Sequence, residues 1–222
     1  MNTVRWAVAA LTLSVVAASP AAGRSPEPGT EPYVPARLAL AAARSGLRAD
    51  VLRLAMRAHA RAITSRLTRS PLLTIIDYSR RSRERRLWVL DVERGSVLAH
   101  ELVAHGRNSG DDVSERFSNR AGSLQSSLGT FLTGATYAGK HGLSLRLRGL
   151  EAGNDQAERR AIVVHGADYV NPSIVQQLGR LGRSQGCPAL SRAAAPRIIR
   201  LIAEGTVLFA YHPSMRSELA GL

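Results

Sequence analysis

The stretch "GRSQGCPAL", residues 182–190, contains the only cysteine of a 222-residue chain. A cysteine used only for packing behaves as a small hydrophobic residue and is usually found among apolar neighbours. Cys187 stands instead between Gly186 and Pro188, which favour turns. Its neighbours therefore indicate a loop thiol that is available for chemistry, and the alternative is a buried, inert thiol.

A second stretch, "IVVHG" at residues 162–166, contains the best candidate base for that thiol. A thiol attacks as the thiolate, so it needs a nearby base or positive charge. His165 ends an apolar run and precedes Gly166, which predicts an imidazole at the edge of a sheet. The chain between His165 and Cys187 is long enough for a short helix and a return loop. Spacing alone is a weak argument, because the chain has six histidines.

The amino-terminal sequence has the pattern of a secretory signal peptide. Arg5 precedes a short run of Ala, Val and Leu, and small residues follow. The run is too short to span a bilayer comfortably. We expect a signal peptide at residues 1–23 and an exported protein of the periplasm or cell wall; a retained anchor is the alternative. In an oxidising compartment a lone cysteine is a liability unless it is buried or used.

The net charge of +13 comes almost entirely from arginine, since Lys140 is the only lysine. Such a field favours polyanions. An exported protein rarely meets nucleic acid, and an aromatic content of 5% argues against a base-stacking surface. We therefore expect an anionic wall polymer or a membrane surface, and no nucleic acid, as a partner. The alternative is ordinary solvated surface charge.

The rest of the chain divides into a linker, a helical segment, a mainly β domain and a short tail. Helical spacing of apolar residues gives way at Pro71 to short β-branched or alternating runs bounded by turn residues. The helical segment either packs on the β domain or forms a separate module. The predicted divisions are a linker at 24–35, a helical segment at 36–70, the β domain at 71–212 and a C-terminal tail at 213–222.

Individual elements follow from the same patterns. Asn171 is expected to cap a helix whose first residue is Pro172, Gly205 to close the last helix, and His59 to be structural. The predicted helices lie at 36–44, 48–67, 154–161, 171–179 and 195–205, and the predicted strands at 72–79, 86–92, 96–106, 143–150, 161–166 and 206–211.

The residues "HG…GRSQGCP" closely resemble the active-site signature of the L,D-transpeptidases, the YkuD-like enzymes that cross-link peptidoglycan. The resemblance continues in "IIDYSRRSRERRLWVLDV", "VAHGRNSG", "GSLQSSLGTFLTGATYAGKHGLSLRLRGLE" and "RAIVVHGADYV", over residues 72–211. It is closest to the murein L,D-transpeptidase catalytic-domain branch. The implied fold is mainly β, a mixed sandwich or barrel-like catalytic fold with short helices, here preceded by the small helical segment.

The resemblance implies an acyl transfer that needs no cofactor. Cys187 would attack a meso-diaminopimelate carbonyl in a tetrapeptide stem, expel D-alanine and form a thioester. The amine of another stem would then resolve it as a cross-link, whereas water would give an L,D-carboxypeptidase. His165 would act as general base and then acid. Ser184 and Gly186 would shape the loop, with the Gly186 and Cys187 amides as oxyanion donors.

Further residues are candidates for binding the substrate. Arg183 has the charge to hold a carboxylate, or is a solvent-facing loop arginine. His105 is expected to line the same cleft, with Asn108, Ser109 and Asn119, or else to order its loop. Tyr137 and His141 lie in a predicted polar loop. Gln185 stands where many family members have a histidine. The substrate-binding candidates are Arg183, His105, Asn108, Asn119, Tyr137 and Gln185.

Other properties stay open or are expected to be absent. No group of histidines, cysteine and carboxylates has the spacing of metal ligands, so we expect no metal. His100 and His212 are read as structural or exposed. A non-catalytic wall-binding protein is the alternative from another class, because the charge is basic and the histidine before Gly186 is missing. The oligomeric state is not predicted.

Overall fold

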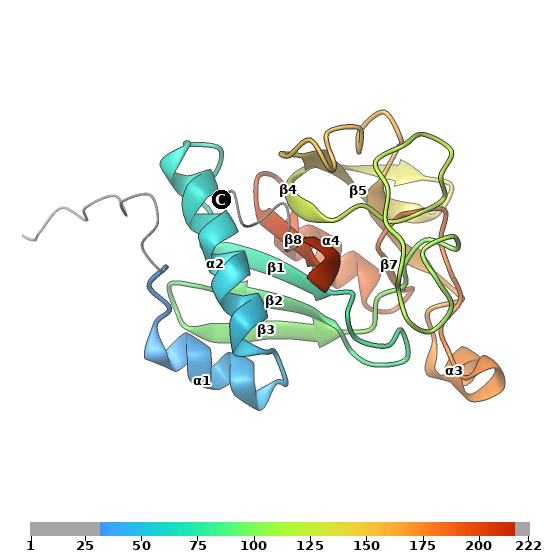
Figure 1. Ribbon diagram of the computed structural model, residues 1–222, viewed down its shortest axis with the longest axis horizontal. Coiled ribbons are helices and arrows are strands. Elements are labelled where there is room, and N and C mark those ends of the chain that lie inside the picture. The colour runs from blue at the N-terminus through green and yellow to red at the C-terminus, as the bar shows by residue number, and fades with distance from the viewer. Residues whose placement is uncertain (1–31, 216–222) are drawn as a thin grey trace, which may run out of the picture.

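Residues 32–215 are described in the computed structural model (Figure 1). The predicted signal peptide, most of the linker and most of the C-terminal tail lie outside the described residues. The helices in this range are α1 (Ala36–Arg44), α2 (Ala49–Thr64), α3 (Pro172–Leu178) and α4 (Ala195–Ile202). The strands are β1 (Leu72–Asp77), β2 (Leu87–Asp91), β3 (Ser96–Glu101), β4 (Gly129–Gly139), β5 (Gly142–Gly149), β6 (Val163–Ala167), β7 (Ala189–Ser191) and β8 (Val207–Tyr211), and a 3-10 turn, η1 (Pro213–Met215), follows β8.

The eight strands form one sheet in the order β3-β2-β1-β8-β4-β5-β6-β7. β1 pairs with β8 and β6 with β7 in parallel, and the other pairs are antiparallel. Beyond β3 the chain reaches β7 at the opposite edge, where the N–H of Ala104 donates to the carbonyl of Ala189 at 2.9 Å. The sheet thus nearly closes on itself, which confirms the predicted mainly β, barrel-like fold.

Two cores lie on opposite faces of this sheet. Because side chains alternate along a strand, Leu73 and Ile75 of β1 face one core and Ile76 faces the other. In β8, Phe209 and Leu208 divide in the same way. The core that includes Leu73 and Ile75 also contains the apolar faces of α1 and α2. The core that includes Ile76 also contains the apolar face of α4. A sheet covered on both faces explains why these strands are apolar throughout.

The helices α1 and α2 pack on the sheet, so they are not a separate module (Figure 1). Both are rich in Ala, Leu and Arg, which favour helix. The indole N–H of Trp88 in β2 donates to the carbonyl of Ser45 at 3.2 Å, beside Gly46, whose φ of +79° ends α1. The Nε2 of His59 bonds to the carbonyl of Ser70 at 2.9 Å, which ties α2 to the segment before β1.

The sequence-based prediction of α3 is confirmed in detail. The side chain of Asn171 accepts a hydrogen bond from the N–H of Ser173 at 2.9 Å, and Pro172 is the first helical residue. Gly179 then ends the helix with a φ of +70°. A helix end at Gly205 was wrong, since α4 ends at Ile202.

The helix predicted at 154–161 was wrong, because this segment consists of turns. Asn154 is completely buried, and its Nδ2 donates to the carbonyls of Leu128 and Thr130 at 3.0 Å. Its Oδ1 accepts the N–H of Glu151 at 2.9 Å. An asparagine that bonds to backbone in this way competes with helix formation.

The strands β4 and β7 were not predicted, and β3 is shorter than the expected run at 96–106. Glycines at 129, 134 and 139 interrupt the apolar pattern of β4, yet the strand pairs with both β5 and β8. Long-range pairing therefore forms this strand where local sequence preference does not.

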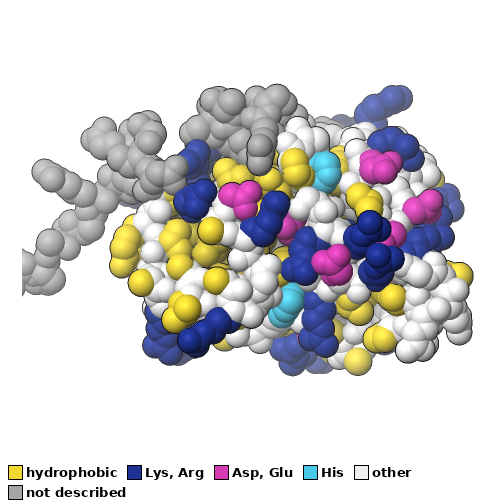
Figure 2. All heavy atoms as spheres, turned by 60° about the horizontal axis from the view of Figure 1, so that its bottom comes forward, with side chains coloured by type: hydrophobic (Ala, Val, Ile, Leu, Met, Phe, Trp, Pro, Cys, Tyr) yellow, Lys and Arg dark blue, Asp and Glu magenta, His cyan; other side chains and the backbone are white. Residues whose placement is uncertain are grey.

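Basic side chains are spread over the face shown in Figure 2, with acidic side chains among them. Ion pairs link the two kinds of charge: the carboxylate of Asp112 lies 3.1 Å from the guanidinium nitrogens of both Arg81 and Arg83. Within residues 32–215, no helix has the length and apolar character that a membrane crossing needs.

Candidate active site

The parallel pairing of β6 with β7 brings the two candidate reactive residues together. His165 lies opposite Ala189. Cys187 lies two residues before Ala189, and Val163 lies two residues before His165. The same parallel register therefore places Cys187 beside Val163, just before β7 begins. Cys187 and His165 line one cleft of about 700 Å³. The predicted thiol and imidazole therefore share a site.

The floor of this cleft is a row of residues in register across three strands. Tyr137 of β4 lies opposite Ser144 of β5, which lies opposite His165 of β6, and all three line the cleft. Tyr137 thus belongs to a strand rather than to the predicted loop. The rest of the wall includes Lys140, His141, Arg160, Tyr169, Arg183, Ser184 and Gln185.

The thiol of Cys187 is held close to the backbone that leads into β6. Its sulfur lies 3.7 Å from the carbonyl of Ala161 and accepts the N–H of Val163. Burial raises the pKa of the thiol, and the Val163 N–H and the charges of Arg160 and Lys140 oppose that rise in part. The resting sulfur is therefore protonated near neutral pH, so attack requires a base.

His165 has the properties of that base. Its side chain is almost completely buried, and Nδ1 lies 3.0 Å from the carbonyl of Gly166. Because a carbonyl oxygen only accepts, Nδ1 carries the proton and Nε2 is the nitrogen that can take one. Burial lowers the pKa of His165, and the positive charges of Arg192 and Lys140 lower it further. The imidazole is neutral at neutral pH, as a general base must be.

Two serines shape the loop before the nucleophile. The hydroxyl of Ser184 accepts the N–H of Gly186 at 3.1 Å and donates to the carbonyl of Cys187 at 2.6 Å. The hydroxyl of Ser126 donates to the carbonyl of Gly186 at 3.0 Å. Gly186 has a φ of +124°, and a Cβ there would lie 2.9 Å from the carbonyl oxygen of Gln125. Only glycine fits this turn.

The hydrogen bond made by the backbone N–H of Gly186 differs from the expectation. Its N–H was predicted as an oxyanion donor, but it points at the Ser184 hydroxyl. The Cys187 amide remains the candidate donor from this loop.

The model of the L,D-transpeptidase catalytic domain matches residues 43–211. The chain belongs to the L,D-transpeptidase catalytic-domain family. The match covers both candidate reactive residues and all eight strands, and it begins within α1, so it includes α2.

Several solved structures, among them L,D-transpeptidases, are similar to this chain at low identity. One from Mycobacterium smegmatis is 16% identical, with a TM-score of 0.40, over 64% of this chain and 59% of that one. One from Xylanimonas cellulosilytica is 18% identical, with a TM-score of 0.36, over 64% and 61%. The helical cell shape determining protein Pgp2 from Campylobacter jejuni is 16% identical, with a TM-score of 0.40, over 64% and 47%.

The chain spans about three fifths of the length of the first of these solved chains. A comparison with curated proteins finds no match.

Arg160 is a cleft residue that sequence reasoning missed. Its guanidinium donates to the carbonyl of Gln125 at 2.6 Å and to the carbonyl of Ser118 and the hydroxyl of Ser127, both at 2.5 Å. It therefore holds the loop that carries Ser126, and its charge opposes the rise in the pKa of Cys187. Its place in the predicted helix at 154–161 hid this role.

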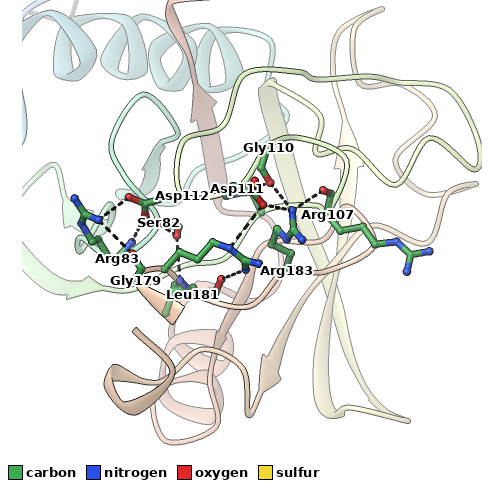
Figure 3. A network of polar contacts seen from close by, with 11 residues as sticks. Ser82, Arg83, Arg107, Gly110, Asp111, Asp112, Gly179, Leu181 and Arg183 are labelled. Carbon is green, nitrogen blue, oxygen red and sulfur yellow. Dashed lines mark hydrogen bonds and ion pairs between the residues drawn. The ribbon is translucent and has the colours of Figure 1, made fainter. Parts of the chain in front are cut away.

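Arg183 lines the cleft but is also bonded within the protein (Figure 3). Its Nη1 lies 2.7 Å from the carboxylate of Asp111, 3.0 Å from the carbonyl of Gly110 and 3.2 Å from that of Arg107. These contacts fasten the nucleophile loop to the loop after β3. Binding of a substrate carboxylate by Arg183 stays a prediction.

His105 lies outside the residues that line the cleft. It is completely buried, with Nδ1 2.7 Å from the Arg86 guanidinium and Nε2 3.2 Å from the carbonyl of Gly110. Burial, with the charge of Arg86, lowers its pKa to about 4. Its own carbonyl accepts the N–H of Ser184 at 2.9 Å. These contacts favour the loop-ordering alternative.

The two asparagines also bond to nearby loops rather than line the cleft. Asn108 donates to the carbonyl of Ser123 at 2.9 Å. Asn119 donates to the carbonyl of Ala152 at 2.8 Å and to the carboxylate of Asp155 at 2.6 Å. Of the substrate-binding candidates, the structure therefore brings Tyr137, Arg183 and Gln185 to the cleft, and leaves His105, Asn108 and Asn119 outside it.

Within the described residues, no three His, Cys, Asp or Glu side chains gather as metal ligands would.

Proposed function

We propose that the protein is a peptidoglycan-modifying enzyme, an L,D-transpeptidase that acts on stem peptides through a thioester on Cys187. The observation that carries this proposal is the placement of a protonated thiol and a neutral, oriented imidazole in one cleft of a family member. A buried inert thiol would need no such partner.

The geometry supports an ordered transfer of protons. Nε2 of His165 takes the thiol proton as the sulfur attacks the diaminopimelate carbonyl. The tetrahedral oxyanion would be stabilised by the Cys187 amide. Collapse breaks the peptide bond, and His165 returns the proton to the departing amine of D-alanine. The amine of an acceptor stem then attacks the thioester, restoring the thiol and completing the cross-link.

The charge of the cleft supports an anionic substrate. Lys140, Arg160 and Arg183 line it, and none of the described lining residues is Asp or Glu. A stem tetrapeptide carries carboxylates near the bond to be broken. Attraction of these groups would favour binding and would weaken as salt increases.

Export to the periplasm or cell wall is part of the proposal. It rests on the signal-peptide pattern of residues 1–23 and on the location of peptidoglycan. The measurement is the amino-terminal sequence of the protein recovered from fractionated cells. A full-length, cytosolic product would contradict export without bearing on the chemistry.

The test of the chemistry is incubation of the purified protein with disaccharide-tetrapeptides, followed by mass spectrometry. We expect release of D-alanine and formation of cross-linked dimers, and loss of both with Cys187→Ala. Identical products from wild type and Cys187→Ala would overturn cysteine catalysis. Tripeptides without dimers would identify the carboxypeptidase alternative, which uses the same acyl-enzyme. Salt-sensitive wall binding without either product would identify a binding protein.

A further inference from the structure

A second imidazole lies against the candidate base. His141 occupies the two-residue turn between Gly139 of β4 and Gly142 of β5. Its ring stacks on that of His165, with ring centroids 4.3 Å apart and 22° between the ring planes. Both side chains line the cleft. The fold therefore places His141 in contact with the candidate base, which the prediction of a substrate-binding loop did not include.

The turn that carries His141 is anchored from the other side of the site. Nη1 of Arg192, after β7, donates to the carbonyl of His141 at 2.9 Å. The same guanidinium makes a two-point contact with Asp168, after β6, at 3.1 and 3.2 Å. Bidentate pairs of this kind fix geometry as well as charge. The position of His141 is thus tied to the two strands that carry His165 and lead from Cys187.

We propose that His141 is a positioning residue, whose stacked ring holds the His165 imidazole with Nδ1 on Gly166 and Nε2 ready to take the thiol proton. The inference rests on the proposed role of His165 as base. The terminal torsion of a histidine side chain is broad, so a single hydrogen bond leaves the ring free to turn. A flat neighbour of fixed position removes that freedom.

The position compensates for a feature of the nucleophile loop. Gln185 stands before Gly186 where many family members have a histidine, and an amide cannot exchange a proton near neutral pH. His141 brings a second imidazole to the cleft from the turn between β4 and β5. It contacts the ring of the base directly, and its backbone is held by Arg192.

The charges around the two rings suit a neutral stack. Lys140 on the same turn and Arg192 from the β7–α4 connection face both imidazoles, and Asp168 pairs with Arg192. Burial is the largest influence that lowers the pKa of each ring, and Lys140 and Arg192 lower both further. For His165 the Gly166 carbonyl opposes this shift, and the neighbouring His141 adds to it. Two neutral rings stack without mutual repulsion near pH 7.

The test separates positioning from substrate contact by using a small reagent. Cys187 is the only thiol, so the rate of alkylation by iodoacetamide at pH 7, followed by intact mass, reports its coupling to His165. The tautomer of His165 is read from ¹⁵N chemical shifts of the imidazoles. The variants are His141→Ala, His141→Phe and Arg192→Met in the full chain. His100→Ala is the matched control, because His100 stacks on Trp88 outside the cleft.

We expect His141→Ala to slow alkylation roughly 10- to 100-fold and to populate the other tautomer of His165. His141→Phe, which keeps a flat ring, should restore most of the rate and the Nδ1–H tautomer. Arg192→Met should give an intermediate loss, and it decides the question if His141→Ala does not fold. His100→Ala should match wild type.

Two results would overturn the inference. One is a wild-type rate and tautomer in His141→Ala, and the other is a His141→Phe variant as slow as His141→Ala. The proposed function fails in a different way, through absence of any tetrapeptide product or through a wild-type alkylation rate in His165→Ala. The tautomer measurement stands in either case, since it needs no substrate.

Discussion

The hydroxyl of Ser184 bonds to the carbonyl of Cys187, three residues further along, at 2.6 Å, and accepts the N–H of Gly186 at 3.1 Å. One buried side chain thus closes the turn on which the nucleophile stands. The motif serine is explained by this closure, with no direct part in the chemistry.

Replacing Ser184 with alanine should therefore affect both stability and activity. The buried backbone groups of Gly186 and Cys187 would lose their partner, at a cost of about 1–3 kcal/mol in the free energy of unfolding. Displacement of the sulfur should lower the rate of D-alanine release roughly 100-fold. Urea unfolding and product analysis measure the two effects. Ser173→Ala, on the exposed start of α3, is the control and should change neither. A Ser184→Ala enzyme with wild-type rate would refute this account of the turn.

The thiol should titrate above its ordinary pKa of 9.0, because burial is the largest influence on Cys187. The sign follows directly: the uncharged thiol is favoured, so the proton is lost only at higher pH. The rate of alkylation by iodoacetamide should still be rising at pH 9. A plateau reached below pH 7 would instead indicate a resting thiolate–imidazolium pair.

Replacing Arg160 should change the reactivity of Cys187 far more than replacing its neighbour Arg159. Arg160→Met removes the donors to the carbonyls of Ser118 and Gln125 and a charge that opposes the rise in the pKa of Cys187. We expect the alkylation profile to move to higher pH and the acyl-transfer rate to fall roughly 10-fold.

Arg159→Met is the matched control, since Arg159 is exposed and its guanidinium donates a 3.5 Å hydrogen bond to the side chain of Gln156 rather than to the loop that carries Ser126. Equal profiles for the two variants would show that the guanidinium of Arg160 has no influence on the thiol.

Much of the fold could be predicted because local chemistry and final structure agree. α1 has the predicted bounds of 36–44, and α3 begins at the predicted Asn171–Pro172 cap. β4 could not be predicted, since its glycines weaken every local signal and its pairing partners are distant in sequence. The turns around Asn154 could not be predicted either, because its hydrogen-bond partners, Leu128 and Thr130, lie on a distant segment of the chain.

Some residues of the candidate site could likewise be predicted from their local sequence, and others could not. Cys187 and His165 stand out from their own neighbours, because a loop thiol and a strand-end imidazole are unusual in themselves. The position of His105 depends on its contact with Arg86, and that of His141 on its stacking against His165. The three histidine–glycine pairs of the sequence therefore have different surroundings: His141 and His165 line the cleft, whereas His105 is buried outside it.

The buried His105 should make stability depend on pH in acid. Its folded pKa of about 4 lies below the ordinary value of 6.5. Above pH 6.5 the ring is neutral in both states, so it costs nothing. As the pH falls from 6.5 to 4, the unfolded chain takes up a proton that the folded protein refuses, and stability is lost. The full loss from this group is about 3 kcal/mol.

His105→Gln tests this assignment, since glutamine can still accept from Arg86 and donate to Gly110 but does not titrate. The variant should lose less free energy of unfolding between pH 7 and pH 4 than wild type, by about 2–3 kcal/mol. Urea unfolding at several pH values measures the difference. His100→Gln, at a partly exposed site, should change the acid dependence much less. Parallel curves for wild type and His105→Gln would mean that His105 is protonated inside the fold. The buried contact with the Arg86 guanidinium makes that outcome electrostatically unfavourable.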